Sequence, residues 1–568
     1  MRLAVNKSKY TTSIYVIKSV FENGVSRTKV VEKLGTLEKI AARSGGQDPL
    51  VWAKQYVAEL TLKEKQKNQK VVIELSPTKV ISCADRRLFN GGYFFLQRLY
   101  YDLGLDVICN EISNKYSLDY DLNSILSRLI YARIIYPESK LSAYEESQKF
   151  IEPPKFQFHD VYQSLDVIAK EADYIQSALY KNSQKCHAHN SRILFYDSTN
   201  FFFEIDEEIE LNQYKISKEH SPNPVAQLGL FTDGAGIPLA FCINPENTNE
   251  CATLNSLEKK LIKDFGLSKL VVCTDVALAS TTNSVFNNFD DKAFITKQSI
   301  KQLKGVFRQW ALDENGWNIF NNHDIYNLSA INECAHKETI FYKERWINEN
   351  GLEQRLIVMF SVNTKNYQRK IREGQINRAL KLIENNPKTF ESSQNDYKRL
   401  ISTMNLTTTG EVTENTIFSI NEELIKEESM YDGYYAICTN LVDSVSEIAK
   451  INRGRWEIEE SFRIMKTDFK MRSVHLSKNE SIEAHFTTCF IALLISRLLE
   501  KKLDSKYTSR EIIDTLRELN FIKEKGECYI PGFIPTEITN DIHERFGFRL
   551  DYEILVLSYI KKLQKLTK

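Results

Sequence analysis

A chain of 568 residues is longer than one hydrophobic core usually organises, so the sequence predicts two to four domains. Its apolar share of 42% and charged share of 26% are those of an ordinary globular protein. Because 75 Lys and Arg balance 75 Asp and Glu, no overall field attracts a polyanion, and any nucleic-acid surface must come from local segregation of charge.

The sequence predicts a protein of the reducing cytoplasm. The first residues, MRLAVNKSKYTTSIYV, lack a continuous apolar run of the signal-peptide type. The most hydrophobic run, Phe490–Ile495, is too short to span a bilayer and predicts a core helix. Ten cysteines without a C-x-x-C pair argue against a disulfide framework and against a zinc ribbon.

Residues 1–80 are expected to form a β-hairpin followed by a linker. Two strand-like segments, TSIYVIKSVF and SRTKVVEKLG, flank Glu22-Asn23-Gly24, and Asn-Gly suits a tight reversal. Basic residues exceed acidic residues up to Lys33. A solvated strand face explains that excess at least as well as a DNA contact does.

Residues 81–189 have helical periodicity. Apolar residues recur at a spacing of three to four in the segments Tyr93–Leu105, Leu122–Ile135 and Val161–Tyr180. Such a region can bind DNA or mediate dimerisation, and it can equally serve only for packing, because no segment resembles a clear recognition helix.

From residue 190 the pattern changes to short apolar runs of strand length, separated by Gly, Pro or Asn. The runs are RILFYDST, QLGLFTD, PLAFCIN and KLVVCTD. A mixed region, 301–430, follows, with a strand at Arg355–Val362 and a basic helical stretch at Lys365–Lys388. The strand Tyr434–Asn440 precedes an amphipathic helix, and residues 506–568 are expected to be helical.

Two aspartates, Asp197 and Asp275, each end an apolar run of strand length. At the end of a strand the backbone stops pairing and side chains reach a cleft. Either aspartate alone could merely cap a following helix. Two such residues together with a glutamate on a helix favour a shared site.

The helical glutamate comes from the stretch RWEIEESFRIMK, Arg455–Lys466. At about 100° per residue, Arg455, Glu459 and Lys466 fall within roughly 40° of one another, along the edge of an apolar stripe. Glu460 lies about 100° away and should face elsewhere. The two cations could form helix-surface pairs, of which Arg455 with Glu459, at i,i+4 spacing, would gain only about 0.2–0.5 kcal/mol, or they could hold DNA phosphates.

Three converging carboxylates would repel one another unless cations screened them. Mg²⁺ prefers oxygen ligands and commonly binds carboxylates together with substrate phosphates. Two such ions, about 3.5–4 Å apart, can activate a nucleophile and stabilise the leaving oxygen when a phosphodiester is displaced. The residue types therefore suit metal-dependent phosphoryl transfer.

Taken together, three motifs resemble those of a known family. YDST (196–199), CTDVALAS (273–280) and GRWEIEESFRIMK (454–466) are similar to the three acidic motifs of DDE-type insertion-sequence transposases. The last motif is similar to that of the subgroup defined by Tyr-x2-Arg-x3-Glu-x6-Lys. The resemblance covers about residues 190–505. Asp275 and Glu459 are 184 residues apart, too far for one αβ connection, and this subgroup carries an insertion domain in that gap.

The resemblance implies an α/β fold with an RNase H-like catalytic core, a mixed sheet flanked by helices. Residues 190–300 and 431–505 would form this core, and a mixed, largely β insertion domain, 301–430, would interrupt it. Asp197, Asp275 and Glu459 would be the catalytic residues and would bind two Mg²⁺ ions, which Mn²⁺ could replace. The N-terminal β-hairpin, the helical region and the helical C-terminus would lie outside the core.

The implied partner is double-stranded DNA, both the transposon terminal repeats and the target, held by a homodimer in the nucleoid. Arg455 and Lys466 would bind phosphates near the metal ions. Asn452 stands where the subgroup has its tyrosine; asparagine can hydrogen-bond to phosphate but cannot stack. Further DNA-contact candidates lie in the region 301–430: Arg369, Lys370 and Arg372 for phosphates, and Trp317 and Trp346 for stacking on an unpaired base.

The expected activity is metal-dependent cleavage at transposon ends, as by an endonuclease, followed by strand transfer into target DNA. Two alternatives remain open from the sequence. An RNase H-like nuclease that cuts without joining would share the metal site. A catalytically inactive, transposase-derived DNA-binding protein would be consistent with Asn452, although retention of all three acidic residues argues against it.

Overall fold

The computed structural model describes the chain except for residues 8–11, 23–24, 45–47, 68–76, 79, 82–84, 190–192, 204–224, 246–270, 275–292, 321, 323, 350–351, 385–395, 407–411, 472, 475–477 and 525–527. It divides into two compact units. The first comprises Met1–Cys83 with Glu524–Gly526, and the second comprises Ala84–Lys523 with Glu527–Lys568.

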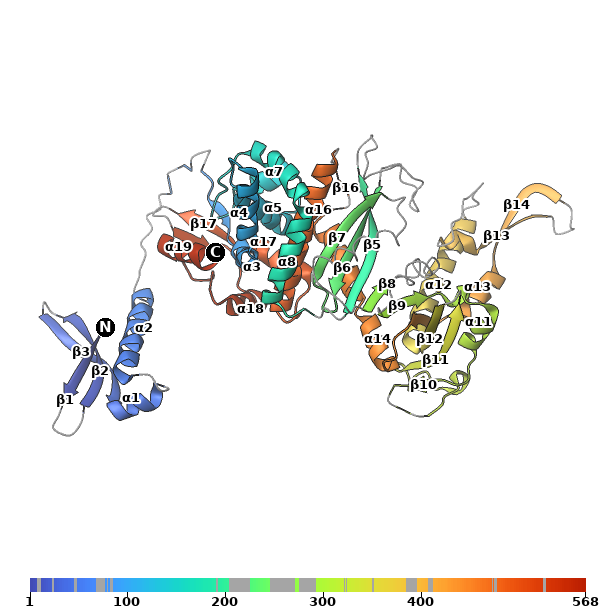
Figure 1. Cartoon of the computed structure of the whole chain (residues 1–568), viewed down its shortest axis with the longest axis horizontal. Helices are drawn as coiled ribbons and strands as arrows, with labels where there is room; N and C mark the ends of the chain where they lie inside the picture. The colour runs from blue at the N-terminus through green and yellow to red at the C-terminus, as the bar shows by residue number, and fades with distance from the viewer. Residues whose placement is uncertain are drawn as a thin grey trace. The chain divides into compact units, whose positions relative to one another are not determined.

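The first unit is a three-stranded antiparallel sheet packed against two helices (Figure 1). Alternate residues of the sheet, such as Ile14 and Val16, are buried with Ile40 and Val57 of the helices. The predicted hairpin is confirmed as β2 paired with β3, whereas β1 and both helices were not expected. The elements are β1 (Arg2–Lys7), β2 (Thr12–Glu22), β3 (Val25–Thr36), α1 (Leu37–Arg43) and α2 (Pro49–Lys67).

The second unit is built on a mixed ten-stranded sheet, which agrees with the α/β class. Its strand order is β10-β11-β12-β15-β9-β8-β5-β6-β7, with β16 beside β5. The neighbours β5, β8 and β9 run parallel, while β6 and β7 are antiparallel. The strands are β5 (Ile193–Phe203), β6 (Val225–Asp233), β7 (Pro238–Pro245), β8 (Val271–Thr274), β9 (Ala293–Gln298), β10 (Asn318–Ile319), β11 (Ile340–Glu349), β12 (Leu352–Ser361), β15 (Tyr434–Thr439) and β16 (Ser473–Val474).

The region 301–430 differs from the separate insertion domain that we expected. Its strands β10, β11 and β12 extend the central sheet, because the apolar strand β12 pairs with β15 and is buried there. The helix α11 packs against these strands, with Ala311 buried beside Phe341 and Leu356. The later elements, from α12 to α13, form a small apolar cluster around Ala379, Leu400 and Ile401. The elements of the region are η2 (Ile300–Gln302), α11 (Gly305–Leu312), η3 (Leu328–Ala330), α12 (Val362–Glu384), η4 (Tyr397–Leu400), β13 (Ile401–Leu406), β14 (Val412–Ile420) and α13 (Glu422–Ser429).

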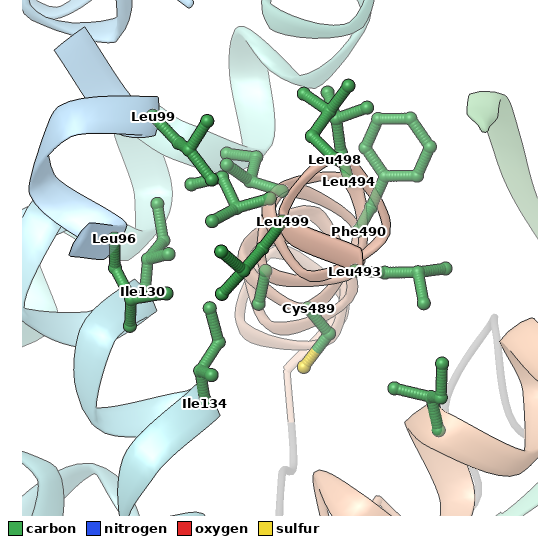
Figure 2. Close-up of a cluster of buried hydrophobic side chains, with 14 of the residues drawn as sticks. Leu96, Leu99, Ile130, Ile134, Cys489, Phe490, Leu493, Leu494, Leu498 and Leu499 are labelled. Atoms are coloured by element: carbon green, nitrogen blue, oxygen red, sulfur yellow. The ribbon is translucent and has the colours of Figure 1, made fainter. Parts of the chain in front are cut away.

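Residues 81–189 are helical as predicted, and they surround a long apolar helix, α16 (Asn479–Lys502). Figure 2 looks along α16 and shows Leu96 and Leu99 of α3 and Ile130 and Ile134 of α5 on one side of it. The helices are α3 (Tyr93–Asp102), α4 (Leu105–Tyr116), α5 (Leu122–Ile135), α6 (Lys140–Ser147), α7 (Phe158–Lys170) and α8 (Ala172–Cys186).

Within the described part of the chain, α16 is the one helix long and apolar enough to cross a membrane, and 94% of its most apolar window is buried inside the protein. Phe490 of α16 packs on Phe241 of β7, with ring centroids 5.1 Å apart. The helix therefore joins the helical region to the central sheet, as the apolar run at Phe490–Ile495 predicted.

The C-terminal region contains strands as well as the expected helices. A four-stranded sheet has the order β19-β18-β17-β4, so its edge strand β4 comes from the beginning of the second unit. The elements are β4 (Leu88–Asn90), α17 (Ser509–Glu518), β17 (Asn520–Glu524), β18 (Cys528–Pro531), α18 (Glu537–Phe546), β19 (Leu555–Val556) and α19 (Leu557–Leu566).

Three short helical elements precede α16: α14 (Val445–Arg453), α15 (Trp456–Arg463) and the π-helical turn η5 (Ile464–Asp468). Ser444 and Glu447 form a capping box that begins α14. Gly454 ends α14 close to the sheet: a Cβ atom there would lie 2.8 Å from Cζ of Phe195. Any larger residue would push this segment off β5.

A buried ionic cluster fixes α15 on α16. The guanidinium of Arg497, which is fully buried, donates to Glu457 of α15 and to Glu500. Lys501 lies 3.2 Å from the other oxygen of Glu457. The turn between β6 and β7 closes over this pair at Gly236, where a Cβ atom would lie 2.6 Å from Oε2 of Glu457. The helices α15 and α16 and the turn between β6 and β7 are therefore held together at this cluster.

We expect Arg497→Met to lower the free energy of unfolding by about 3–5 kcal/mol, because Glu457 and Glu500 would remain buried without their cation. Thermal and urea unfolding followed by circular dichroism measures the loss. Lys506→Met, which removes an exposed partner of Asp541, is the control and should change stability little. Equal stability of the two variants would contradict the role given to Arg497.

Candidate catalytic site

Asp197 lies in the middle of β5, opposite Leu230 of β6. The predicted strand end was therefore wrong for β5, which continues to Phe203. On its other side, however, β5 pairs with β8 only over Ile193–Phe195. Asp197 thus lies beyond the described pairing with β8, and its Oδ1 accepts a hydrogen bond from the backbone of Ser198 at 2.9 Å.

Asp275, the second predicted carboxylate, lies outside the described residues. The strand that precedes it is confirmed as β8, which ends at Thr274 and pairs there with Thr296 of β9. Among the described residues, no group of three or more His, Cys, Asp or Glu side chains could hold a metal ion. The predicted triad includes Asp275 and therefore lies partly outside the described residues.

One face of β5 carries Asp197 together with Phe195, Thr199 and Phe201, because side chains alternate along a strand. The segment Gly454–Lys466 covers this face. At one end Gly454 contacts Phe195, and at the other the ammonium of Lys466 donates to Thr199 and lies 5.3 Å from the ring centre of Phe201.

Glu459, in the first turn of α15, presents its carboxylate to solvent and to β9. Its side chain is 58% exposed, and Oε1 lies 4.0 Å from Nζ of Lys297. The N-terminal turn of a helix favours a carboxylate through the helix dipole. Glu459 is therefore held on a rigid element with its oxygens accessible.

The register of the sheet relates Lys297 to Asp197. Phe195 of β5 is level with Cys273 of β8, and Cys273 is level with Ile295 of β9. Two residues further along, on the same face, β5 carries Asp197 and β9 carries Lys297. With one strand between them, their Cα atoms are about 10 Å apart. Asp197, Lys297 and Glu459 therefore share one face of the sheet.

Lys297 is a site residue that the sequence did not reveal. Lys297 lies in a short strand, after the apolar residues Ala293–Ile295. The sequence signal for it is a cation near the end of an apolar strand that pairs with β8. That signal is common, because lysines often end strands at a surface.

Arg455 is buried rather than open to solvent, at 4% exposure. Burial raises the pKa of the Cys273 thiol to about 12, and the positive charge of Arg455 lowers this pKa. The guanidinium of Arg455 is therefore near Cys273 of β8. Its position favours support of the α15 N-terminus over contact with DNA at an open surface. Arg455, Glu459 and Lys466 face the same sheet, as the wheel suggested, but each approaches a different strand.

Glu460 points away from this group, as expected. Its two carboxylate oxygens accept from Nε and Nη2 of Arg463, each at 2.7 Å, in a bidentate pair. Asn452, in the last turn of α14, is half-buried, and its Oδ1 accepts no hydrogen bond from the described residues. Glu460 is thus committed to its own helix, while Asn452 keeps acceptor capacity.

The predicted DNA contacts on α12 divide into two kinds. Arg369 and Lys370 are exposed and remain candidates for phosphate binding. Arg372 instead forms a buried bidentate pair with Asp432, and hydrogen bonding to Asp432 raises the pKa of the guanidinium. Because a buried pair is not readily exchanged for phosphate, the geometry favours a structural role for Arg372.

The two tryptophans also differ. Trp317 is fully buried, packs beside Phe360 and Tyr434, and donates from Nε1 to the carbonyl of Asp313 at 2.8 Å. The prediction that it stacks on a base is therefore wrong, since no base can reach it. Trp346 is 48% exposed on β11 and remains a candidate.

Comparison with known proteins identifies part of the chain. Residues 335–495 match the family model described as the transposase DDE domain. This segment contains Arg455, Glu459 and Lys466 but neither Asp197 nor Asp275. No curated protein matches the sequence.

Two solved structures show distant likenesses. A piggyBac transposase synaptic complex with hairpin DNA aligns over 83% of this chain and 84% of its own, with 8% identity and a TM-score of 0.35. A Mos1 transposase paired-end complex with the left transposon end aligns over 42% of this chain and 66% of its own, with 11% identity and a TM-score of 0.13. TM-scores this low do not establish a common fold.

We expect Trp317→Ala to lower the free energy of unfolding by about 3–5 kcal/mol, because the substitution leaves a large cavity in the core beside β12 and β15. Trp346→Ala, at an exposed position of the same region, is the matched control and should change stability little. Thermal unfolding of both variants measures the difference. A larger loss for Trp346→Ala would contradict the assignment of Trp317 to the core.

Proposed function

We propose that this chain, a DDE-type transposase by its transposase DDE domain, cuts DNA at the ends of an insertion sequence and joins the freed ends to target DNA, using Asp197, Asp275 and Glu459 as metal ligands. Both steps are phosphoryl transfers, in which positioning and charge stabilisation supply most of the catalysis.

One observation carries the proposal. Glu459 lies within the segment that matches the family, Asp197 lies more than a hundred residues before it, and both belong to the same face of one sheet. Two acids on the same side of a sheet repel each other unless a cation screens their charges. A cation bound by both carboxylates would explain why Asp197 and Glu459 are on the same side of the sheet.

The third carboxylate of the proposed site is Asp275. In the sequence it directly follows Thr274, the last residue of β8. The register that aligns Phe195 with Cys273 reaches Asp197 and Asp275 when it is extended by two residues. On this proposal Asp275 completes the row between Asp197 and Lys297.

We further propose that β5–β9 with their covering helices form the RNase H-like core. The mixed character of the sheet supports this, since β5, β8 and β9 are parallel while β6 and β7 are antiparallel. The elements that cover the Asp197 face, α15 and α16, are fixed to each other through Glu457 and Arg497. Glu459 is therefore presented from a rigid support.

The donor set suits hard divalent cations. Carboxylate oxygens are the ligands that Mg²⁺ and Mn²⁺ prefer, and the oxygens of Glu459 are half-exposed beside a flexible lysine. Two bound Mg²⁺ ions would activate the attacking oxygen and stabilise the leaving oxygen. Asp197, Asp275 and Glu459 would hold the ions.

The cations around the carboxylates would act on the DNA. The ammonium of Lys466 donates a hydrogen bond to Thr199, two residues past Asp197 on β5. There it would act as a point charge that neutralises a phosphate next to the carboxylates. Asn452 would contact a DNA phosphate through its amide N–H groups, because its Oδ1 is buried and a phosphate oxygen only accepts hydrogen bonds. Arg455 positions the start of α15 from beneath.

The family resemblance also supports double-stranded DNA as partner, a homodimer that pairs two transposon ends, and activity in the cytoplasm at the nucleoid. The rival function, an RNase H-like nuclease without joining activity, shares every residue of this site. A strand-transfer assay with precut ends separates the two, because only a transposase produces joined molecules.

We expect Glu459→Gln to reduce cleavage of a transposon-end duplex about 10³-fold, because loss of a metal ligand removes several kcal/mol of charge stabilisation, at 1.36 kcal/mol per tenfold. DNA binding measured in Ca²⁺ should persist. Glu460→Gln, one residue away and paired with Arg463, is the control and should cleave at nearly the normal rate. Equal losses in the two variants would contradict the site.

We expect Lys297→Met to tighten Mn²⁺ binding to the DNA-free protein about fivefold, because an ammonium about 4 Å from Glu459 competes with the metal by about 1 kcal/mol in water. Isothermal titration with Mn²⁺ measures the change. Lys301→Met, at an exposed lysine over Tyr431, is the control. Unchanged or weaker Mn²⁺ binding in Lys297→Met would contradict the competition.

A further inference from the structure

A cluster of basic side chains lies past Lys466, where α5, α6 and α16 meet the end of η5. Its members are Arg133 of α5, Lys140 at the start of α6, Lys470 just after η5, and His485 of α16. Arg133 donates from Nη1 to the carbonyl of Phe469 at 3.2 Å, so its guanidinium lies at the end of the π-helical turn.

The cluster has too little negative charge of its own. Burial and Arg133 lower the pKa of Lys140 to about 8, and burial, Arg133 and Lys140 together hold the pKa of His485 well below its usual value. Among the described residues, neither Arg133 nor Lys140 forms a salt bridge with a carboxylate. The nearby Glu138 pairs with Lys470 at 3.1 Å.

Such an arrangement is unfavourable unless an anion completes it. Two cations that are partly removed from water repel each other more strongly than they would in bulk solvent. Lys140, with a pKa of about 8, still carries its proton at pH 7 for most of the time. A charged group of opposite sign, supplied from outside the chain, would relieve the repulsion.

A line of contacts leads from the carboxylates to this cluster. Lys466 lies over Phe201, the ring of Phe201 meets that of Phe486 edge-on with centroids 5.2 Å apart, and Phe486 follows His485. Along β5, Phe201 is four residues past Asp197, about 13 Å at about 3.3 Å per residue. One DNA strand advances about 3.4 Å per nucleotide, so Phe201 lies about four nucleotides from Asp197, and the cluster lies beyond Phe201.

We propose that Arg133, Lys140 and Lys470 bind the DNA backbone at least about four nucleotides from the phosphate that is cut, with Lys466 between them and the carboxylates. The ligand is a phosphodiester of the duplex. This inference rests on the proposed function, which makes DNA the substrate. It assigns the direction in which the DNA leaves the site, along β5 toward the beginning of α16.

The test is the salt dependence of DNA binding by the full-length protein. A fluorescently labelled duplex of mixed sequence is titrated with protein in Ca²⁺ at several salt concentrations, and anisotropy gives the dissociation constants. Loss of one phosphate contact should reduce the slope of log K against log salt by about 0.9. We expect this reduction for Lys140→Gln and no reduction for Lys140→Arg, which keeps the charge.

Lys149→Gln is the matched control, because Lys149 lies just after α6, the helix that begins at Lys140, and already pairs with Glu146 at 2.5 Å. An unchanged slope in Lys140→Gln, or an equal reduction in Lys149→Gln, would overturn the inference. So would inorganic phosphate at millimolar concentration, if it abolished the difference between wild type and Lys140→Gln, because the site would then serve free phosphate.

The outcome is independent of the catalytic proposal. Glu459→Gln should keep the wild-type salt slope while losing cleavage. If Glu459→Gln cleaves normally but Lys140→Gln reduces the slope, the catalytic assignment fails and the phosphate site stands. If Glu459→Gln loses cleavage but Lys140→Gln keeps the wild-type salt slope, only the phosphate site is refuted. A wild-type protein that binds no DNA would overturn both.

Discussion

The buried pair between Arg497 and Glu457 is the interaction on which the site depends. It joins the helix that presents Glu459 to the central core helix, and the turn at Gly236 seals it against the sheet. A buried ion pair adds little net stability over a well-packed apolar contact, but it is costly to break on one side. Its main effect is therefore positional: α15 has one orientation on α16 that satisfies both charges.

The second constraint is the register of the sheet. Two short parallel strands, β8 and β9, are aligned with β5 so that Asp197 and Lys297 occupy one row, and α15 adds Glu459 above it. A shift of one residue in either pairing would turn a row member to the other face. The sheet beyond β9 stabilises that register, because β15 pairs with β9 and β12 pairs with β15.

Much of this could be predicted from local patterns. Apolar runs of strand length became β5, β6, β7, β8, β12 and β15, because strands that are buried on both faces cannot include many polar residues. What failed depended on distant partners. The pairing of β12 with β15 joins residues that are far apart in sequence, so the expected insertion domain was divided between the sheet and a small separate cluster. The burial of Arg455 and Trp317 and the approach of Lys297 to Glu459 likewise depend on tertiary packing. Lys466 lies within the π-helical turn η5, to which a wheel of 100° per residue does not apply.

The central claim is that Asp197, Asp275 and Glu459 converge on one metal centre. Crystals of the protein grown with Mn²⁺ and a transposon-end duplex, measured at the manganese absorption edge, test it most directly. The account predicts anomalous peaks for manganese ions that are coordinated by carboxylate oxygens of all three residues, with metal–oxygen distances of about 2.1 Å. Manganese bound elsewhere, or at Glu459 alone with Asp197 remote from it, would contradict the account.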